Sequence, residues 1–156
     1  MTIDSYIHLQ TRRAGKVKGE GVATGHEGDI LVRRWNWGVS AQTAMGSVQA
    51  TARRSYRSLV VVKGTDTAST GLLSALATND EVKELRLMMR KAGEGQKDFL
   101  RITLKGARIS GIDVECAGDG DLEETVTVAF TKIEVEYTPQ QSSGGRGGAY
   151  IFTDEV

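Results

Sequence analysis

Residues 30–38, ILVRRWNWG, contain both tryptophans of the chain, Trp35 and Trp37, two positions apart. In an extended strand successive side chains point to opposite faces, so the two tryptophans share one face while Arg34 and Asn36 share the other. Large aromatic side chains contribute much of the apolar surface that a core buries. We therefore expect Trp35 and Trp37 to anchor a core and the opposite face to meet solvent or a partner.

The same period of two recurs along most of the chain and predicts a mainly β protein. The last long apolar run changes phase, because its apolar residues occupy even positions up to Phe130 and odd positions from Ile133. A phase change at Thr131 or Lys132, without Gly or Pro, predicts the point where the chain passes from one sheet to another in a sandwich or barrel. The expected strands cover residues 3–9, 30–37, 57–62, 84–90, 99–105, 126–130, 133–137 and 149–153.

One helix is predicted over residues 66–78, packed against a sheet. Asp66 is a candidate N-cap, and Asn79 can adopt the left-handed conformation that often follows a helix. The apolar stripe of this helix is Leu72, Leu73 and Leu76. We expect Leu72 and Leu73 of the helix, together with Tyr137 of the last long strand, to be further core anchors.

Length and composition indicate one soluble domain spanning residues 1–156, since 39% of the residues are apolar and 26% are charged. No apolar run approaches the length of a membrane span, so no membrane insertion is expected. Residues 1–10 alternate apolar and polar residues and lack the pattern of a cleavable export signal. The single cysteine, Cys116, excludes an internal disulfide framework and favours folding in the reducing cytoplasm.

The net charge is zero, but the two halves of the sequence differ. Residues 1–63 carry ten Lys or Arg and four Asp or Glu, whereas residues 64–156 carry ten and sixteen. If the halves also separate in space, this difference would favour head-to-tail self-association. The basic half lacks the interleaved aromatic residues of a single-strand nucleic-acid binder, so no nucleic-acid partner is expected.

The sequence offers little that points to catalysis, a metal or a cofactor. His8 and His26 are the only histidines, and neither has a neighbouring Ser or Cys in an arrangement typical of a nucleophile and base. Six acidic residues between 113 and 124 do not follow the spacing of a calcium loop, and a solvated acidic connection is the simpler interpretation. We expect no enzyme activity, no bound cofactor and no metal.

Seven segments in order along the chain resemble the Hcp family, the tail-tube proteins of bacterial type VI secretion systems. Each segment alone is weak, and their common order is what makes the resemblance specific. The segments are the opening strand, VKGE at 17–20, WNWGVS at 35–40, the helix at 66–78 with its Leu pair, RKAG at 90–93, ITLK at 102–105, and EVEYTPQ at 134–140 before a Gly-rich loop and last strand.

This resemblance implies a β-barrel of two packed sheets with one flanking α-helix, closing as a homohexamer into rings that stack into a hollow tube. It also implies a contractile sheath and baseplate that expel the tube, the spike protein VgrG at its tip, and effector proteins in its lumen. The protein would be cytoplasmic before firing and then secreted to the extracellular space or a target cell. The chain ends soon after the last strand, so no C-terminal effector domain is expected.

Two regions receive roles from the resemblance. Asn36, with Arg34 on the same face, would contact effectors in the lumen, and two adjacent arginines there would favour acidic cargo; Arg34 paired with a neighbouring strand is the alternative. Residues 39–52 correspond to an extended loop that packs on a neighbouring subunit, and a disordered loop is the alternative. The residues expected to make the inter-subunit contact are Met45, Gly46, Ser47 and Val48.

The sequence also allows two other functions. A tube protein of a phage-like contractile injection system would share the same fold. A monomeric β-barrel that binds a small apolar ligand would instead require an apolar interior pocket.

Overall fold

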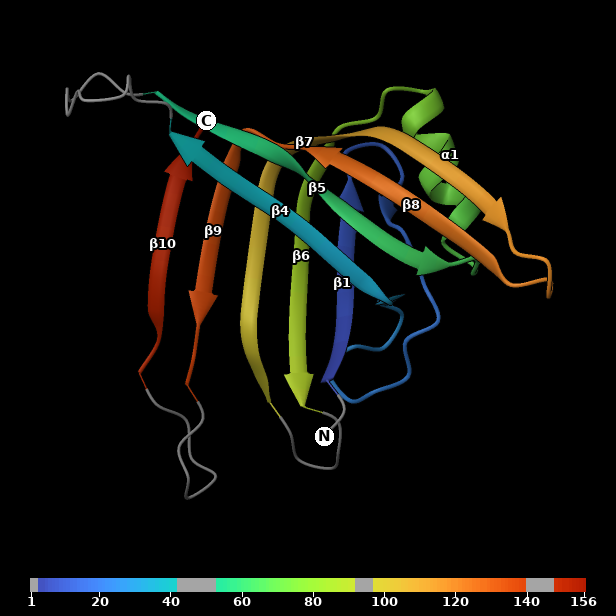
Figure 1. Ribbon diagram of the computed structural model, residues 1–156, viewed down its shortest axis with the longest axis horizontal. Helices are drawn as coiled ribbons and strands as arrows, with labels where there is room; N and C mark the ends of the chain where they lie inside the picture. The colour runs from blue at the N-terminus through green and yellow to red at the C-terminus, as the bar shows by residue number, and fades with distance from the viewer. Residues whose placement is uncertain (1–2, 42–52, 92–96, 140–147) are drawn as a thin grey trace.

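The computed structural model describes residues 3–41, 53–91, 97–139 and 148–156, which form ten strands and one helix (Figure 1). The strands are β1 (Ile3–Thr11), β2 (Gly15–Lys16), β3 (Ile30–Val32), β4 (Arg34–Ala41), β5 (Arg54–Gly64), β6 (Val82–Lys91), β7 (Asp98–Cys116), β8 (Leu122–Ala129), β9 (Lys132–Tyr137) and β10 (Tyr150–Glu155). The helix α1 is Ser69–Ala77. The expected strands at 84–90 and 99–105 are confirmed within β6 and β7, which pair antiparallel.

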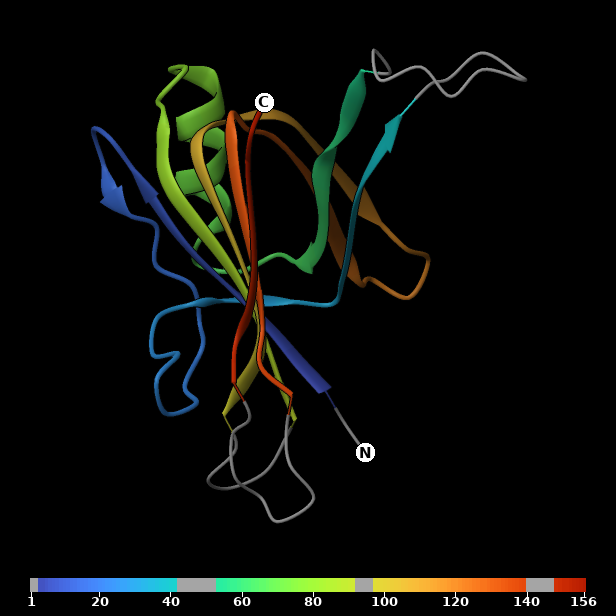
Figure 2. The same ribbon diagram turned by 90° about the vertical axis from the view of Figure 1, so that its left-hand side faces the viewer.

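The strands form two packed sheets that share β7. The larger sheet contains β1, β2, β3, β6, the first half of β7, β9 and β10, and the smaller sheet contains the second half of β7, β8, β5 and β4. Figure 2 shows β4 and β5 of the smaller sheet at the right, beside the larger sheet. The hydrogen-bonded path from β2 to β4 does not close into a ring, so the expected barrel is an open one.

The chain changes sheets where the sequence changed phase. β8 lies in the smaller sheet and β9 in the larger one, and Thr131 lies between them. The Thr131 hydroxyl donates to the carbonyl oxygen of Gly106, 3.1 Å away, at the point where β7 also changes sheets. Gly106 has φ +55°, and a Cβ there would lie 2.3 Å from Thr131 Oγ1, so this junction needs glycine.

The single strand expected over residues 30–37 is wrong. The chain bends at Arg33, so that β3 pairs with β1 in the larger sheet while β4 pairs with β5 in the smaller sheet. The backbone N–H of Arg33 donates to the carbonyl oxygen of Val62, 2.8 Å away. A third change of sheet therefore occurs inside a stretch whose alternation looked continuous.

Most of the expected core anchors are confirmed. Trp35 and Trp37 are partly buried against the core, and Leu72 is fully buried in it. Leu73 is 45% exposed, because α1 buries the side of the helix that carries Leu72 and Ala75. Tyr137 is 47% exposed at the end of β9, where the larger sheet extends past the smaller one (Figure 1). The assignments of Leu73 and Tyr137 as core anchors were thus wrong.

The helix is shorter than expected, because residues 66–68 form a turn before it. Asp66 Oδ1 accepts a hydrogen bond from the backbone N–H of Ala68, 3.0 Å away, and Ala68 itself occupies the N-cap position. At the other end Asn79 adopts φ 54°, as predicted. α1 contributes buried side chains to the same core as both sheets.

Candidate functional site

The outward face of the smaller sheet carries Asn36, and its neighbours there are small. Asn36 of β4 is exposed and lies opposite Val60 of β5, which in turn lies opposite Thr127 of β8. Trp35 and Trp37 are partly buried on the other face. The predicted alternation is confirmed, and Asn36 lies in a cross-strand row of short, uncharged side chains.

Arg34 shares this face but is not a free positive charge. Its guanidinium forms an ion pair with Glu123, 3.1 Å away, at the start of β8. Hydrogen bonds from Arg34, together with those from Arg33, outweigh partial burial and lower the pKa of Glu123. Pairing with another strand was one of the two interpretations of Arg34, and it is the one observed.

Arg33 is neutralised in the same way. It donates to both carboxylate oxygens of Asp121, at 2.9 and 3.0 Å, and this bidentate contact lowers the pKa of Asp121. The two arginines and the two carboxylates together carry no net charge at neutral pH. The expectation that adjacent arginines would favour acidic cargo therefore loses its physical basis.

The acidic connection is also less solvated than its composition suggested. Glu124 is buried, and its carboxylate lies 2.9 Å from the Nζ atom of Lys63, whose side chain is 1% exposed. Lys63 also contacts Asp66 and Ser69, at 2.9 and 3.1 Å. This buried cluster joins β5, β8 and the start of α1. The prediction that the acidic residues are solvated is therefore wrong for Glu124.

The basic and acidic halves of the sequence do not separate in space. Ion pairs join them throughout the described structure, because strands of the first half lie next to strands of the second half, such as β1 beside β6 and β5 beside β8. These pairs include Arg12–Glu81, Arg33–Asp121, Arg34–Glu123, Arg54–Asp154 and Lys63–Glu124. Charge separation between the halves therefore cannot drive association.

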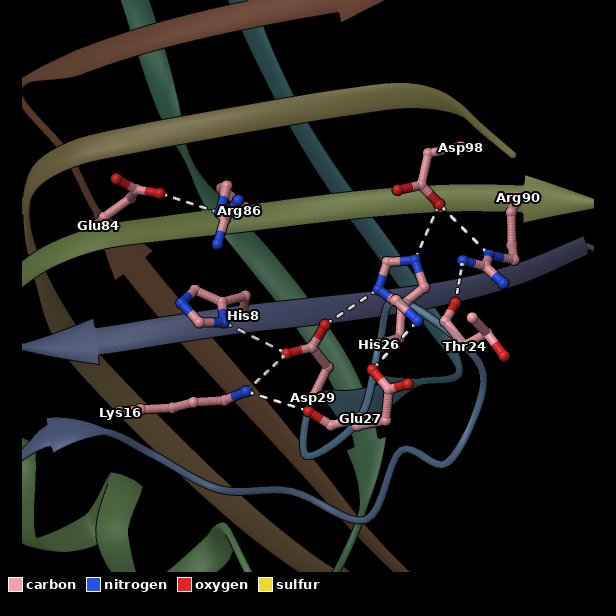
Figure 3. Close-up of polar contacts among 11 residues, drawn as sticks. His8, Lys16, Thr24, His26, Glu27, Asp29, Glu84, Arg86, Arg90 and Asp98 are labelled. Carbon is pink, nitrogen blue, oxygen red and sulfur yellow. Dashed lines mark hydrogen bonds and ion pairs between the residues drawn. The ribbon is translucent and has the colours of Figure 1, made fainter. Parts of the chain in front are cut away.

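A second polar cluster lies on the outer face of the larger sheet and centres on His26 (Figure 3). His26 is 1% exposed, with Nδ1 3.0 Å from Asp29 and Nε2 2.8 Å from Asp98 of β7. Its ring stacks on Tyr6 of β1 at a centroid distance of 4.3 Å. The ring therefore contacts one carboxylate through each of its nitrogens.

Residues around His26 also form hydrogen bonds with the loop at residues 17–29. Burial alone would raise the pKa of Asp29, but hydrogen bonds from His26, Lys16 and His8 outweigh it and lower the pKa. Arg90 of β6 donates to the carbonyl oxygen of Thr24, 2.7 Å away, as Figure 3 shows. The cluster fastens the loop to the sheet. No local sequence pattern indicates this cluster, because His26 and Asp98 are 72 residues apart.

The predicted inter-subunit contact cannot be placed on the structure. Met45, Gly46, Ser47 and Val48 lie outside the described residues, whereas Val39–Ala41 continue β4 and so belong to a strand. Among residues 3–41, 53–91, 97–139 and 148–156, no group of three or more His, Cys, Asp or Glu side chains could hold a metal ion. No helix in that part of the chain is long and apolar enough to cross a membrane.

These features are those of a β-sandwich protein whose smaller sheet has a solvent-facing side and whose elements are joined by polar clusters. A family model described as "Type VI secretion system effector, Hcp" matches residues 6–137. The chain therefore belongs to the Hcp family of secreted type VI secretion tube proteins.

Individual relatives agree with this assignment. The protein Hcp1 of Pseudomonas aeruginosa is 32% identical over 155 residues, which cover 97% of this chain and 93% of the relative. The solved structure of a type six secretion system protein superposes with a TM-score of 0.85 at 27% identity, covering 96% of this chain and 92% of the other. Hcp1 from E. coli EAEC 042 shares the fold with a TM-score of 0.82 at 18% identity, covering 99% and 100%.

Proposed function

We propose that this chain is the structural subunit of a type VI secretion tube, and that six copies close into a ring whose stacking forms the tube. One observation carries the proposal. The smaller sheet ends in a strand edge on each side, at β4 and at the second half of β7, and neither edge has a strand partner within the described residues. Two different edges on one subunit suit a heterologous contact that closes a ring.

The outward face of this same sheet is our candidate for the tube lumen. It presents Asn36 among short uncharged residues, and Arg34 beside it is held by Glu123. The uncharged row around Asn36 suits cargo that binds there by hydrogen bonds and shape more than by net charge. Asp113 of β7, opposite Thr125 of β8, adds an exposed negative charge to the same face. Effector proteins would thus be carried against Asn36, with Arg34 at the border of the contact.

The remaining partners follow from the family. A contractile sheath assembled on a baseplate would expel the stacked rings, and VgrG would occupy the tip of the tube. The protein would be cytoplasmic before firing and outside the cell afterwards. Residues 39–52, including Met45 to Val48, remain our candidate for an arm that packs on a neighbouring subunit. In this role the chain acts as a transport component and not as a catalyst.

One alternative is disfavoured by the interior. A monomeric ligand-binding barrel needs an apolar pocket between its sheets, but the cavity there has a volume of about 10 Å³. Its lining includes Leu9, Ile30, Leu72 and Lys63. That volume is about what one water molecule needs and is far below the volume of an organic ligand site. A phage-like injection tube has the same fold and is separated from our proposal by its partners.

Imaging and cargo recovery test the proposal together. Negative-stain electron microscopy of the purified chain should show rings with a central hole, and solid or single-subunit particles would overturn it. Asn36→Asp, with effectors from the same secretion gene cluster co-expressed, should reduce effector recovery on intact rings at least tenfold. Lys83→Glu, an exposed change on β6 of the larger sheet, is the matched control. Unchanged recovery with Asn36→Asp would overturn the lumen contact but not the ring.

A further inference from the structure

The end of the β4–β5 hairpin extends beyond the packed core. Val39 is 48% exposed, and both Ser40 and Ala41 of β4 are exposed, as are Arg54 and Ser55 at the start of β5. Successive residues of a strand point to opposite faces, so exposure of successive residues means that neither face is packed. Hydrophobic burial therefore does not fix the direction of this hairpin end.

The last strand of the chain holds this hairpin end instead. Arg54 donates through Nε and Nη2 to the Asp154 carboxylate of β10, and Nη2 also donates to the carbonyl oxygen of Glu155, 2.7 Å away. The Tyr56 hydroxyl donates to Asp154 at 2.7 Å. The side chains of Arg54 and Tyr56 thus reach from the start of β5 to the end of β10. We call Arg54, Tyr56 and Asp154 the hairpin clamp.

The clamp connects the two sheets where no hydrogen-bonded ladder joins them. β5 belongs to the smaller sheet and β10 to the larger one. Tyr56 continues the connection inward, because its ring packs on Trp37 and Phe130 with centroid distances of 6.2 and 5.7 Å. The clamp thus joins an exposed hairpin end both to the C-terminal strand and to the border of the core.

The chemistry of the clamp favours one fixed geometry. A guanidinium that binds a carboxylate through two nitrogens has a defined orientation, which a single lysine contact would not give. Hydrogen bonds from Arg54 and Tyr56 lower the pKa of Asp154 to about 2. The carboxylate therefore stays charged at any physiological pH. The pair is exposed, with Arg54 53% accessible, so salt should weaken it.

We propose that Asp154 is a positioning residue which sets the direction of the β4–β5 hairpin end, so that a second copy of this chain can dock on it. The inference rests on the proposed ring function, in which the edge of β4, without a further strand partner in the described residues, meets a second copy. Residues 148–156 lie outside the family match at residues 6–137. The C-terminal strand would thereby control assembly without itself forming the contact.

Asp154→Asn tests the inference, because the amide keeps the size of the side chain but loses its charge. Glu155→Gln is the matched control: Glu155 is the next residue on the same strand, its side chain is 75% exposed, and the clamp contacts only its backbone carbonyl and N–H. Two readouts are needed: amide hydrogen exchange at Val39–Ala41 and Arg54–Tyr56, and the protein concentration at which half the subunits are assembled.

For Asp154→Asn we expect at least a tenfold rise in the amide exchange rate of the hairpin end and in the protein concentration at which half the subunits are assembled. Exchange in β6 should be unchanged, and Glu155→Gln should behave like wild type. The charge-exchanged double variant Arg54→Asp with Asp154→Arg should recover part of the assembly. If wild type and Asp154→Asn assemble at the same concentration, the inference is overturned while the ring function stands. If wild type does not assemble at all, the ring function fails, and the inference fails with it.

Discussion

The buried ion pair between Lys63 and Glu124 makes the sharpest prediction about how this fold is held together. Lys63 Nζ has Glu124, Asp66 and Ser69 as its oxygen partners, all within 3.1 Å. Glu124→Ala removes one carboxylate and leaves the ammonium buried, with Asp66 as its remaining counter-ion. The hydroxyl of Thr65, which donates to Glu124 at 2.8 Å, loses its acceptor as well.

The expected cost follows from this geometry. Removing one partner of a buried pair typically costs about 3–5 kcal/mol, and the remaining Asp66 places this site at the low end, about 3 kcal/mol. For a chain of this length, such a loss lowers the melting temperature by about 6–12 °C. Lys63→Met combined with Glu124→Leu removes both charges, and replacing a whole buried pair by apolar residues is often nearly neutral. The double variant should therefore recover most of the loss.

Urea unfolding at one fixed protein concentration measures these differences, since assembly would otherwise shift the apparent stability. The neighbouring Glu123→Ala is the control, because Glu123 pairs with arginines at the surface and its loss should change stability much less. If Glu124→Ala and Glu123→Ala cost the same, or if the double variant is as unstable as Glu124→Ala, the reasoning is refuted.

The same pair predicts a dependence on pH. Burial raises the pKa of Glu124, but hydrogen bonds from Lys63, Ser69 and Thr65 outweigh it, and the net pKa in the folded state is lowered. A lowered pKa contributes stability above the unfolded value, near 4.5, and this contribution is lost as pH falls through the folded value. Wild type should therefore lose stability below about pH 4.5 more steeply than Lys63→Met with Glu124→Leu. Parallel curves from pH 7 to pH 3 would contradict this.

Three further predictions concern the core, the sheet junction and the loop. Leu72→Ala should cost about 2–4 kcal/mol in urea unfolding, and Leu73→Ala, its exposed neighbour, under about 1 kcal/mol; equal costs would contradict the observed helix face. Gly106→Ala should lower the free energy of unfolding by about 1–3 kcal/mol, because Gly106 has φ +55° and Thr131 occupies the space of the new Cβ. Adding Thr131→Ser to this variant should not restore stability, because serine keeps the hydroxyl. His26→Asn should raise amide exchange in the loop 17–29 at least tenfold with β7 unchanged, and exchange like wild type would show that the cluster does not hold the loop.

The parts of the fold that sequence predicted well depend on neighbouring residues. The alternation of Trp35, Asn36 and Trp37 placed each side chain on its observed face, because the geometry of a strand is local. The phase change at Thr131 located a change of sheet, because a period of two must be re-set when the buried face changes. Asn79 likewise took the left-handed conformation expected beyond a helix.

The parts that it missed depend on residues far away in the chain. Tyr137 is apolar in pattern, but its burial depends on how far the smaller sheet reaches over β9. The sequence left open whether Arg34 faces cargo or pairs with a neighbouring strand, because its partner Glu123 lies 89 residues away. The clamp between Arg54 and Asp154 spans 100 residues and has no local signature. Such contacts are set by the packing of the sheets, which a single sequence does not specify.

The most direct test of the central claim is the mass of the native particle. Native mass spectrometry, or light scattering coupled to size exclusion, compares that mass with the 16.8 kDa of one chain. We predict a particle of six chains at micromolar concentration, and larger species that are multiples of six where rings stack. A particle of one chain, or of a number other than six, would contradict the proposal that this protein builds a hexameric tube.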